Sequence, residues 1–158
     1  WNQFEDWREY NQWFGSWFPD ERGGSFITKL LEPLEYTLDD VWIGDSIKCP
    51  TEEQRKIPTE DISSESAFSH CQSYLRKEIE TIAPTVLVPL GAPAVKRTHR
   101  VLGVPREDAN NIGVEEEYGL SEYSTEPPIV NCLHWAQRRV PHDEFLPVVR
   151  QDIENTLD

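Results

Sequence analysis

The sequence lacks several features that would place the chain in a particular class of protein. It contains no Met and only three Cys, and three Cys cannot all pair within one chain. A secreted disulfide framework is therefore disfavoured, and a reducing cytoplasm is the compartment we expect. No hydrophobic run approaches the roughly 20 residues that span a bilayer, and there is no signal-peptide pattern, so we expect no membrane partner. The missing Met, with Trp1 at the start, indicates a segment of a longer product.

Basic residues are also scarce. The chain has 15 Lys and Arg against 29 Asp and Glu, which gives a formal net charge of −14. This charge at first argues against a nucleic-acid partner, because phosphate binding normally uses a basic face. An acid-rich surface with few Lys suits a halophilic cytoplasm, where salt screens the repulsion between carboxylates. An ordinary acidic protein from a mesophile is the alternative interpretation.

The few basic residues are not evenly spread. Several gather at 96–100, whereas carboxylates crowd two other segments, 51–66 and 104–127. A local basic surface on an acidic protein can still bind phosphate where salt screens long-range repulsion. We therefore expect Lys96 and Arg97 to contact any nucleic acid that the protein binds.

Aromatic residues are plentiful. Six Trp, five Tyr and six Phe supply too much apolar area for a chain that stays unfolded. Many of them lie within residues 1–18 at steps of three and four, which predicts one face of a helix. That face either packs on the body of the domain or offers a platform on which bases stack.

Apolar periodicity predicts alternating helices and strands. Helices are expected over 1–18, 25–38, 67–82, 92–102 and from about 143, and strands over 41–49, 85–90 and 128–133. The segment 104–127 has no periodicity and is expected to be a surface excursion. Nearly continuous apolar runs are typical of parallel strands buried on both faces. The order predicts one α/β domain over residues 1–158, a three-layer α/β/α sandwich on a short, mainly parallel sheet.

Ligands of an open parallel sheet bind beyond the carboxyl ends of its strands. Three segments fall there, namely 45–50, 91–94 and 134–139, and the last is the richest in chemistry because it begins with His134 and Trp135. The same segment ends with Arg138 and Arg139. An imidazole beside two guanidinium groups can hold an anion or stabilise charge on a leaving group. The alternative is a surface histidine in a salt-bridged turn.

Four short motifs follow one another in a consistent order. They are Ile47-Lys48-Cys49-Pro50, the Cys-x-x-Tyr-Leu of 71–75, the Ile-x-Pro and Leu-Gly-x-x-Ala of 82–94, and a strand that ends in His134. Their order over residues 23–158 resembles the uracil-DNA glycosylase superfamily, closest to its microbial iron–sulfur branch, and is similar to a haloarchaeal member without the N-terminal motif. The resemblance implies a monomeric hydrolase that flips uracil, or a related deaminated base, out of single- or double-stranded DNA and hydrolyses its N-glycosidic bond.

The resemblance also implies roles for particular residues. His134 is the hydrogen-bond donor to O2 of the leaving base, and Phe26 and Phe18 are both candidates for the ring on which the base stacks. The loop that wedges into the duplex and grips phosphate corresponds to Trp135, Gln137, Arg138 and Arg139. In this loop Trp135 stands where the family usually has Pro.

Two further departures from the family concern substrate recognition and the attacking water. Asp45 occupies the position where a base-reading Asn is usual, and a carboxylate accepts from N3–H of uracil but repels O4 unless it is protonated. Asp45 therefore has a raised pKa, or reads a base with an amino group there, or uracil is not the substrate; alternatively it only caps a turn. The family's first motif, a Gly-rich turn with the acid that positions water, is not found before residue 23. The domain is thus expected to lack an N-terminal strand and motif.

The cysteines gain a second interpretation from the resemblance. Cys49 and Cys71 match the later two of the four thiolate ligands of a 4Fe–4S cluster, which implies a cluster in the parent protein, while Cys132 is expected in the core. Two other functions remain open at this point. One is a non-catalytic nucleic-acid-binding relative, and the other is a small-molecule or redox-sensing α/β protein whose likeness is only architectural.

Overall fold

The computed structural model describes residues 23–44, 46, 65–137 and 139–158, without the side chains of 23–25 and 65–71. The described elements are, in chain order, helix α2 (Gly23–Leu31), the 3-10 helix η1 (Glu32–Leu34), α3 (Glu65–Ile82), α4 (Ala92–Val101), α5 (Arg106–Asn111), strands β1 (Gly119–Leu120) and β2 (Val130–Asn131), and α6 (His142–Leu157). Within the described residues, no helix is both long and apolar enough to cross a membrane. The predicted aromatic helix over 1–18 lies outside the described residues.

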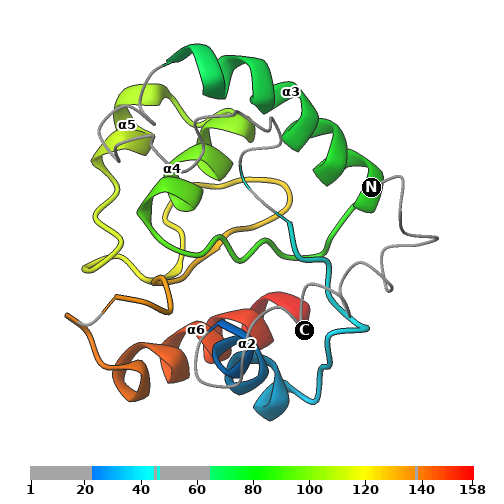
Figure 1. Cartoon of the computed structure of the whole chain (residues 1–158), viewed down its shortest axis with the longest axis vertical. Helices are drawn as coiled ribbons and strands as arrows, with labels where there is room; N and C mark the ends of the chain where they lie inside the picture. The colour runs from blue at the N-terminus through cyan, green and yellow to red at the C-terminus, as the bar shows by residue number, and fades with distance from the viewer. Residues whose placement is uncertain (1–22, 45, 47–64, 138) are drawn as a thin grey trace.

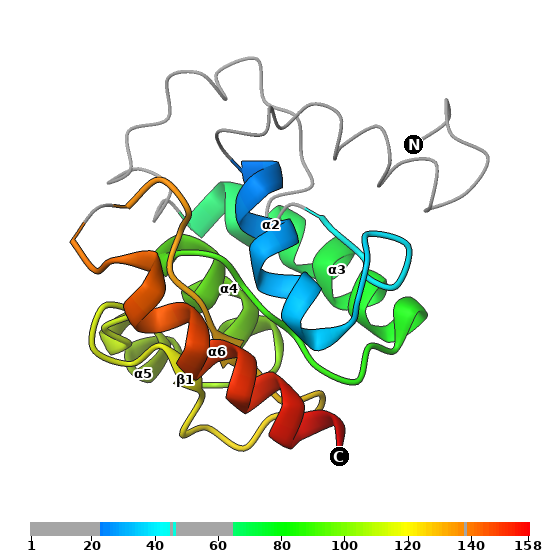
Figure 2. The ribbon, with the colours of Figure 1, turned by 90° about the horizontal axis from the view of Figure 1, so that it is seen from below.

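The helices lie in two groups with extended chain between them. Figure 1 shows α3, α4 and α5 on one side of the extended segments and α2 and α6 on the other. Figure 2 shows α2 and α6 next to each other from below, and the Arg150 side chain joins these two helices by donating to the Lys29 carbonyl at 2.6 Å. The arrangement agrees with the predicted α/β class.

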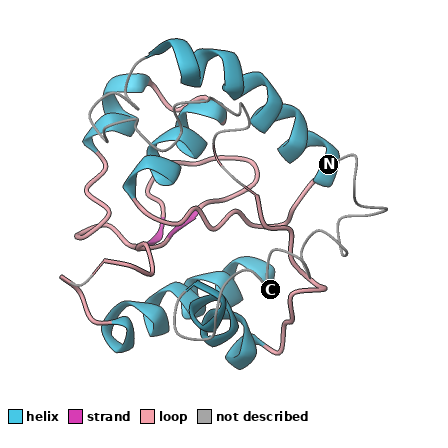
Figure 3. Ribbon diagram, viewed as in Figure 1, coloured by secondary structure: helices cyan, strands magenta, loops and turns pink. Residues whose placement is uncertain are grey.

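The middle layer is only partly a parallel sheet. Residues 85–90 and 128–133 run parallel and form two isolated bridges, Leu87 with Ile129 and Leu90 with Cys132. Proline limits this ladder, because Pro89 lies between the bridged residues and has no N–H to donate. The regular sheet that the structure describes is the short antiparallel pair β1–β2 (Figure 3).

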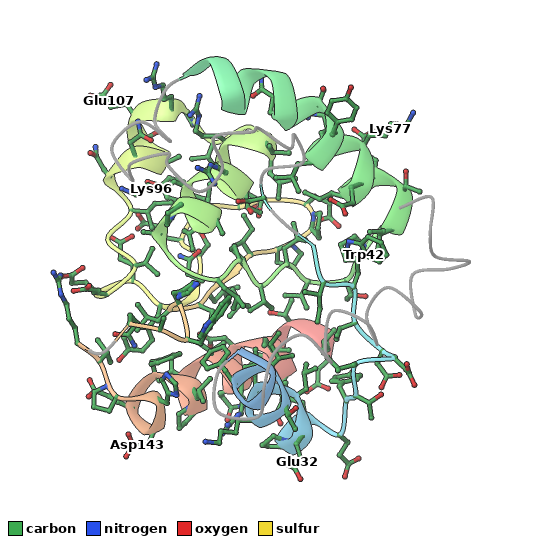
Figure 4. All side chains as sticks on the ribbon, in the orientation of Figure 1. Glu32, Trp42, Lys77, Lys96, Glu107 and Asp143 are labelled. Atoms are coloured by element: carbon green, nitrogen blue, oxygen red, sulfur yellow. The ribbon has the colours of Figure 1, made fainter. Side chains whose placement is uncertain are left out.

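Some predicted elements are wrong in the described part of the chain. Residues 41–44, predicted as the start of a strand, have no regular secondary structure. Val41 and Ile43 nevertheless pack on the core, and between them the Trp42 indole N–H donates to Glu78 of α3 at 2.8 Å (Figure 4). Apolar residues that are partly buried in an irregular segment, as Val41, Trp42 and Ile43 are here, give the same apolar sequence pattern as a strand.

The segment 104–127 is more ordered than predicted, since it contains α5 and β1. The helix predicted over 25–38 is shorter than predicted. It becomes a 3-10 turn at Glu32–Leu34, which contains Pro33, and Glu35 follows with a left-handed φ of 61°. Proline cannot donate the backbone hydrogen bond that would continue α2.

The core lies mainly between α6, α2 and the extended segments. Its buried members are Phe26, Ile27, Leu30, Leu31, Val95, Ile112, Val114, Val130, Cys132, Leu133, Phe145, Leu146, Val149 and Ile153. A smaller cluster of Leu75, Ile79 and Val101 joins α3 to α4. The extended chain that ends at Leu133 is therefore packed on both sides, which fixes the position of the residue that follows it.

Candidate active site

His134 follows the packed segment 128–133 and lies against the start of α4. The N-cap of α4 is Gly91, whose φ of +83° favours glycine, and a Cβ built there would meet Cβ of His134 at 2.9 Å. The Gly91 N–H donates to the Cys132 carbonyl at 2.7 Å and so ties the two segments together. Glycine at this position lets the histidine approach the helix N-terminus closely.

The hydrogen bond to the His134 ring decides which nitrogen carries the proton. The backbone N–H of Ala136 donates to Nδ1 at 3.1 Å, so in the neutral ring Nδ1 is the acceptor and Nε2 bears the hydrogen. Burial lowers the pKa of His134, which favours the neutral form. The ring also stacks on Trp135 with centroids 3.8 Å apart. The site thus presents a neutral imidazole whose Nε2–H is suited to donate to an anion.

The loop after His134 is held by Gln137. The Gln137 side-chain oxygen accepts from the N–H groups of Arg139 at 2.9 Å and Val140 at 3.1 Å, and its amide nitrogen donates to the Val140 carbonyl at 2.7 Å. The Gln137 backbone N–H donates to the His134 carbonyl at 3.0 Å. In this conformation the predicted DNA-contacting Gln137 therefore shapes the loop with its side chain.

Phe26 supports the same loop from the core. It is only 2% exposed, and its ring meets the edge of His142 at 5.2 Å and lies 6.1 Å from the ring of Phe145. The His142 ring donates from Nε2 to the Trp135 carbonyl at 3.2 Å. The structure thus places Phe26 in the closely packed core beneath the loop. Its role as the ring on which a base stacks stays a prediction.

The predicted phosphate-contacting residues make contacts within the protein. Arg97 is 8% exposed and donates to the Ser46 hydroxyl at 3.0 Å. Its pKa is lowered by burial and by the nearby Arg100. Lys96, labelled in Figure 4, donates to the Asn110 carbonyl at 2.6 Å and joins α4 to α5.

Arg139 is the exposed cation of the loop. Its guanidinium contacts both oxygens of Glu115, at 3.0 and 3.1 Å, and its side chain is 80% exposed. An exposed pair of this kind contributes little to stability, so the guanidinium can exchange its carboxylate partner for a phosphate at little cost.

Several predicted site residues lie outside the described residues, namely Phe18, Asp45, Cys49 and Arg138. Cys71 lies on α3, and its side chain is likewise outside the described part. Cys132 is a core residue, and burial raises the pKa of its thiol to about 12. In the described part of the chain, no group of three or more His, Cys, Asp or Glu could hold a metal ion.

The contacts of two residues of the site, Gly91 and Gln137, were not predicted from the sequence. Gly91 lies in the Leu-Gly-x-x-Ala motif, so the motif carried a signal, but only the structure shows that this glycine faces His134. The internal hydrogen bonds of Gln137 leave no periodic pattern in the sequence.

A protein-family model matches the part of the chain that carries His134 and its loop. The model of the family described as "Uracil DNA glycosylase superfamily" matches residues 8–148, a range that includes α2 to the start of α6 and the whole loop after His134. The chain belongs to the uracil-DNA glycosylase superfamily.

Proposed function

We propose that the chain hydrolyses the N-glycosidic bond of uracil, or of a related deaminated base, flipped out of DNA. The observation that carries this proposal is the hydrogen bond from the Ala136 N–H to Nδ1 of His134. It leaves the Nε2–H of a neutral imidazole as the donor, at the N-terminus of α4. Both groups suit an anion that forms during the reaction.

The chemistry requires charge stabilisation more than proton transfer to the base. When the bond between the sugar C1′ and the base nitrogen breaks, its electron pair stays on the base, and negative charge develops on O2. The Nε2–H of His134 hydrogen-bonds this oxygen. A water molecule supplies the hydroxyl that ends on C1′, and the proton that the water releases neutralises the base anion after it leaves. Burial lowers the pKa of His134, so its imidazole is neutral at neutral pH. The ring therefore donates its Nε2–H without a change of protonation state.

A glycosylase assay with separate measurement of DNA binding tests the proposal. The chain is incubated with a uracil-containing single-stranded oligonucleotide in molar KCl, and abasic sites are detected by alkaline cleavage. His134→Ala is expected to lower the rate by about 100-fold or more, because it removes a donor to the developing anion. Lys77→Ala, a change at an exposed residue of α3, is the control and is expected to keep the rate.

The outcomes separate the alternative functions. If the unaltered chain binds DNA but forms no abasic sites, it is a non-catalytic binding relative. If neither activity is found, a small-molecule or redox-sensing role replaces the proposal. An unchanged rate in His134→Ala would remove His134 from its role.

Substrate choice depends on Asp45 in this proposal. By resemblance to the family, an amide at this position serves both O4 and N3–H of uracil, whereas an ionised carboxylate serves only N3–H. Asp45→Asn is therefore expected to raise the rate of uracil release, measured by the same assay. A fall in uracil release, with cleavage of another deaminated base equally reduced, would instead give Asp45 a structural role.

The proposal also covers the oligomeric state, the fold and the cellular setting of the protein. We infer one monomeric domain with the fold of a three-layer α/β/α sandwich, and a haloarchaeal type of protein in a salt-rich cytoplasm. The net charge of −14 supports the last point, because carboxylate repulsion is screened by salt. Glycosylase activity that rises from low to molar KCl would support it, and a maximum at low salt would contradict it.

The chain does not fit a 4Fe–4S cluster by itself. Such a cluster takes four thiolates, and the sequence has three Cys, of which Cys132 is buried with a pKa raised to about 12. Membership of the iron–sulfur branch would require two ligands beyond Cys49 and Cys71, from outside this sequence. No reaction step proposed above passes through a cluster.

A further inference from the structure

The peptide group between Trp135 and Ala136 makes a hydrogen bond at each of its two ends. Its N–H, which belongs to Ala136, donates to Nδ1 of His134 at 3.1 Å. Its carbonyl, which belongs to Trp135, accepts from Nε2 of His142 at 3.2 Å. A carbonyl can only accept, so Nε2 of His142 carries a hydrogen. One planar, rigid peptide group therefore connects the two histidine rings.

This peptide group is the central one of a tight turn. The Gln137 N–H donates to the His134 carbonyl at 3.0 Å, which closes a β-turn over 134–137 with Trp135 and Ala136 in its middle. The central peptide of a β-turn can take two orientations, because type I and type II turns differ mainly by a rotation of this group through about 180°. Rotation would turn the Ala136 N–H away from His134 and bring the Trp135 carbonyl toward it.

The two orientations favour different forms of the neutral His134 ring. In the observed one, Nδ1 accepts from the peptide N–H, and the hydrogen of the ring is on Nε2. In the rotated one, a carbonyl would face Nδ1 and favour a hydrogen there, which leaves Nε2 as an acceptor. Only the observed orientation gives His134 an Nε2–H to donate.

His142 is held firmly enough to fix this orientation. It is the first residue of α6, and its ring packs edge-on against Phe26 at 5.2 Å and Phe145 at 5.6 Å. Both phenylalanines are at most 2% exposed. A side chain that packing has already ordered loses little entropy when it donates a hydrogen bond. Nε2 of His142 therefore anchors the Trp135 carbonyl to the core.

Ala136 restrains the turn in a second way. The rotated peptide would give Ala136 a positive φ, which is unfavourable for a residue with a Cβ. In the described part of the chain the residues other than glycine with positive φ are Glu35 and Ala83, so Ala136 avoids this conformation. The effect of His142 is therefore measured most clearly where glycine replaces Ala136.

We propose that His142 is a positioning residue that acts on His134 through the peptide group between Trp135 and Ala136. The inference rests on the glycosylase function proposed above, because that function uses the Nε2–H of His134 as the donor to O2 of the base. The hydrogen bonds run from His142 through the peptide group to Nδ1 of His134, and each one polarises the next. His142 needs no contact with the substrate for this role.

The form of the His134 ring is measured by two-bond ¹H–¹⁵N NMR correlation on the whole chain labelled at histidine. The spectra are recorded at about pH 8, above the ordinary pKa of imidazole, and His134→Ala identifies the signals of this ring. We expect the Nε2–H form in the unaltered chain and a larger share of the Nδ1–H form in His142→Phe, which keeps an aromatic ring but has no donor. His142→Gln keeps an N–H donor and should restore the Nε2–H form.

The same spectra are recorded with Ala136→Gly, which removes the restraint of the Cβ. In this background His142→Phe is expected to increase the share of the Nδ1–H form further, and His142→Gln again to reverse the change. A His134 ring that does not respond to His142→Phe in either background would overturn the proposal.

Uracil release in the abasic-site assay gives the second readout. His142→Phe is expected to lower kcat by about threefold to tenfold, the effect of about one hydrogen bond, with KM nearly unchanged. His142→Gln should stay within about twofold of the unaltered chain. Val149→Ala, at a buried position about two turns further along α6, loosens the core without removing the donor and should keep kcat. An equal loss in Val149→Ala or in His142→Gln would contradict the role of the hydrogen bond.

The two readouts separate this inference from the function on which it rests. If the chain releases no uracil but the His134 ring responds to His142→Phe, the positioning role stands and the glycosylase function fails. If the chain is active but the ring does not respond, the function stands and the positioning role of His142 fails.

Discussion

At the scale of single residues, the contact between Gly91 and His134 links backbone conformation to the proposed chemistry. Gly91 has a φ of +83° and no space for a Cβ, which would come within 2.9 Å of His134. Gly103 offers a matched comparison, because its φ is +95° but nothing lies within 4 Å of the position of its Cβ. The two glycines share a backbone requirement and differ in what surrounds them.

We therefore expect Gly91→Ala and Gly103→Ala each to lower the free energy of unfolding by about 1–2 kcal/mol or more through backbone strain. Only Gly91→Ala should also displace His134 and lower the rate of uracil release. Urea unfolding and the abasic-site assay measure the two effects. Equal losses of activity in both variants, in proportion to their stability, would show that the contact with His134 has no functional effect.

At the scale of the elements, His99 holds α4 to the segment that leads into the middle layer. Its ring connects the Val95 carbonyl to the Ser121 hydroxyl and lies edge-on to Tyr123 at 5.7 Å. Protonation would place a second hydrogen on Nε2, where the Ser121 hydroxyl now donates, and would charge a buried group. The link between the two elements thus depends on a neutral ring.

The folded-state pKa of His99 is lowered from 6.5, so the unfolded chain binds the proton more readily. The contribution of His99 to stability is present above about pH 6.5 and is lost as the pH falls through the folded-state pKa. We expect the free energy of unfolding to fall from pH 7.5 to 5.5, and His99→Gln to reduce this pH dependence. Urea unfolding at both pH values, in constant KCl, provides the test. Parallel profiles for the two proteins would contradict it.

The elements also show how far the sequence could be interpreted. Helices α3, α4 and α6 follow apolar periodicity and were predicted nearly within their bounds. Helix α5 was missed because it is short and buries a single residue, Ala109, so it has no apolar face to detect. Strand β1 has only two residues, Gly119 and Leu120, and its pairing with β2 depends on a partner distant in the sequence.

Some residues of the candidate site could be placed from the sequence, and others could not. The position of His134 follows from a buried strand and a polar end, both visible in the sequence. The burial of Arg97 could not be predicted, because charged residues are mostly exposed and its contact, Ser46, is distant in the sequence. For Phe26, the sequence shows an apolar residue but not that it packs under the loop.

At the scale of the whole molecule, the charge of −14 matters less to DNA binding than the local pairing of cations. Arg139 is exposed but bound to Glu115. Removing that carboxylate frees the guanidinium for phosphate, while the net charge changes by only one unit.

Glu115→Gln is therefore expected to strengthen binding of single-stranded DNA by a fewfold, and Arg139→Ala to weaken it. Fluorescence anisotropy with a labelled oligonucleotide at constant KCl measures both. Glu144→Gln, an exposed position in the first turn of α6, makes the same change of net charge and serves as the control. If both Gln variants bind equally more tightly, overall repulsion explains the gain and Arg139 has no special part.

The burial of Cys132 gives the molecule a built-in reporter of opening. This thiol lies two residues before His134, is fully buried and has a pKa raised to about 12, so it is almost entirely unionised while the chain is folded. An alkylating reagent can modify it only after the core around it opens. The rate of modification at this one sulfur therefore follows the opening of the same packed segment that positions the histidine.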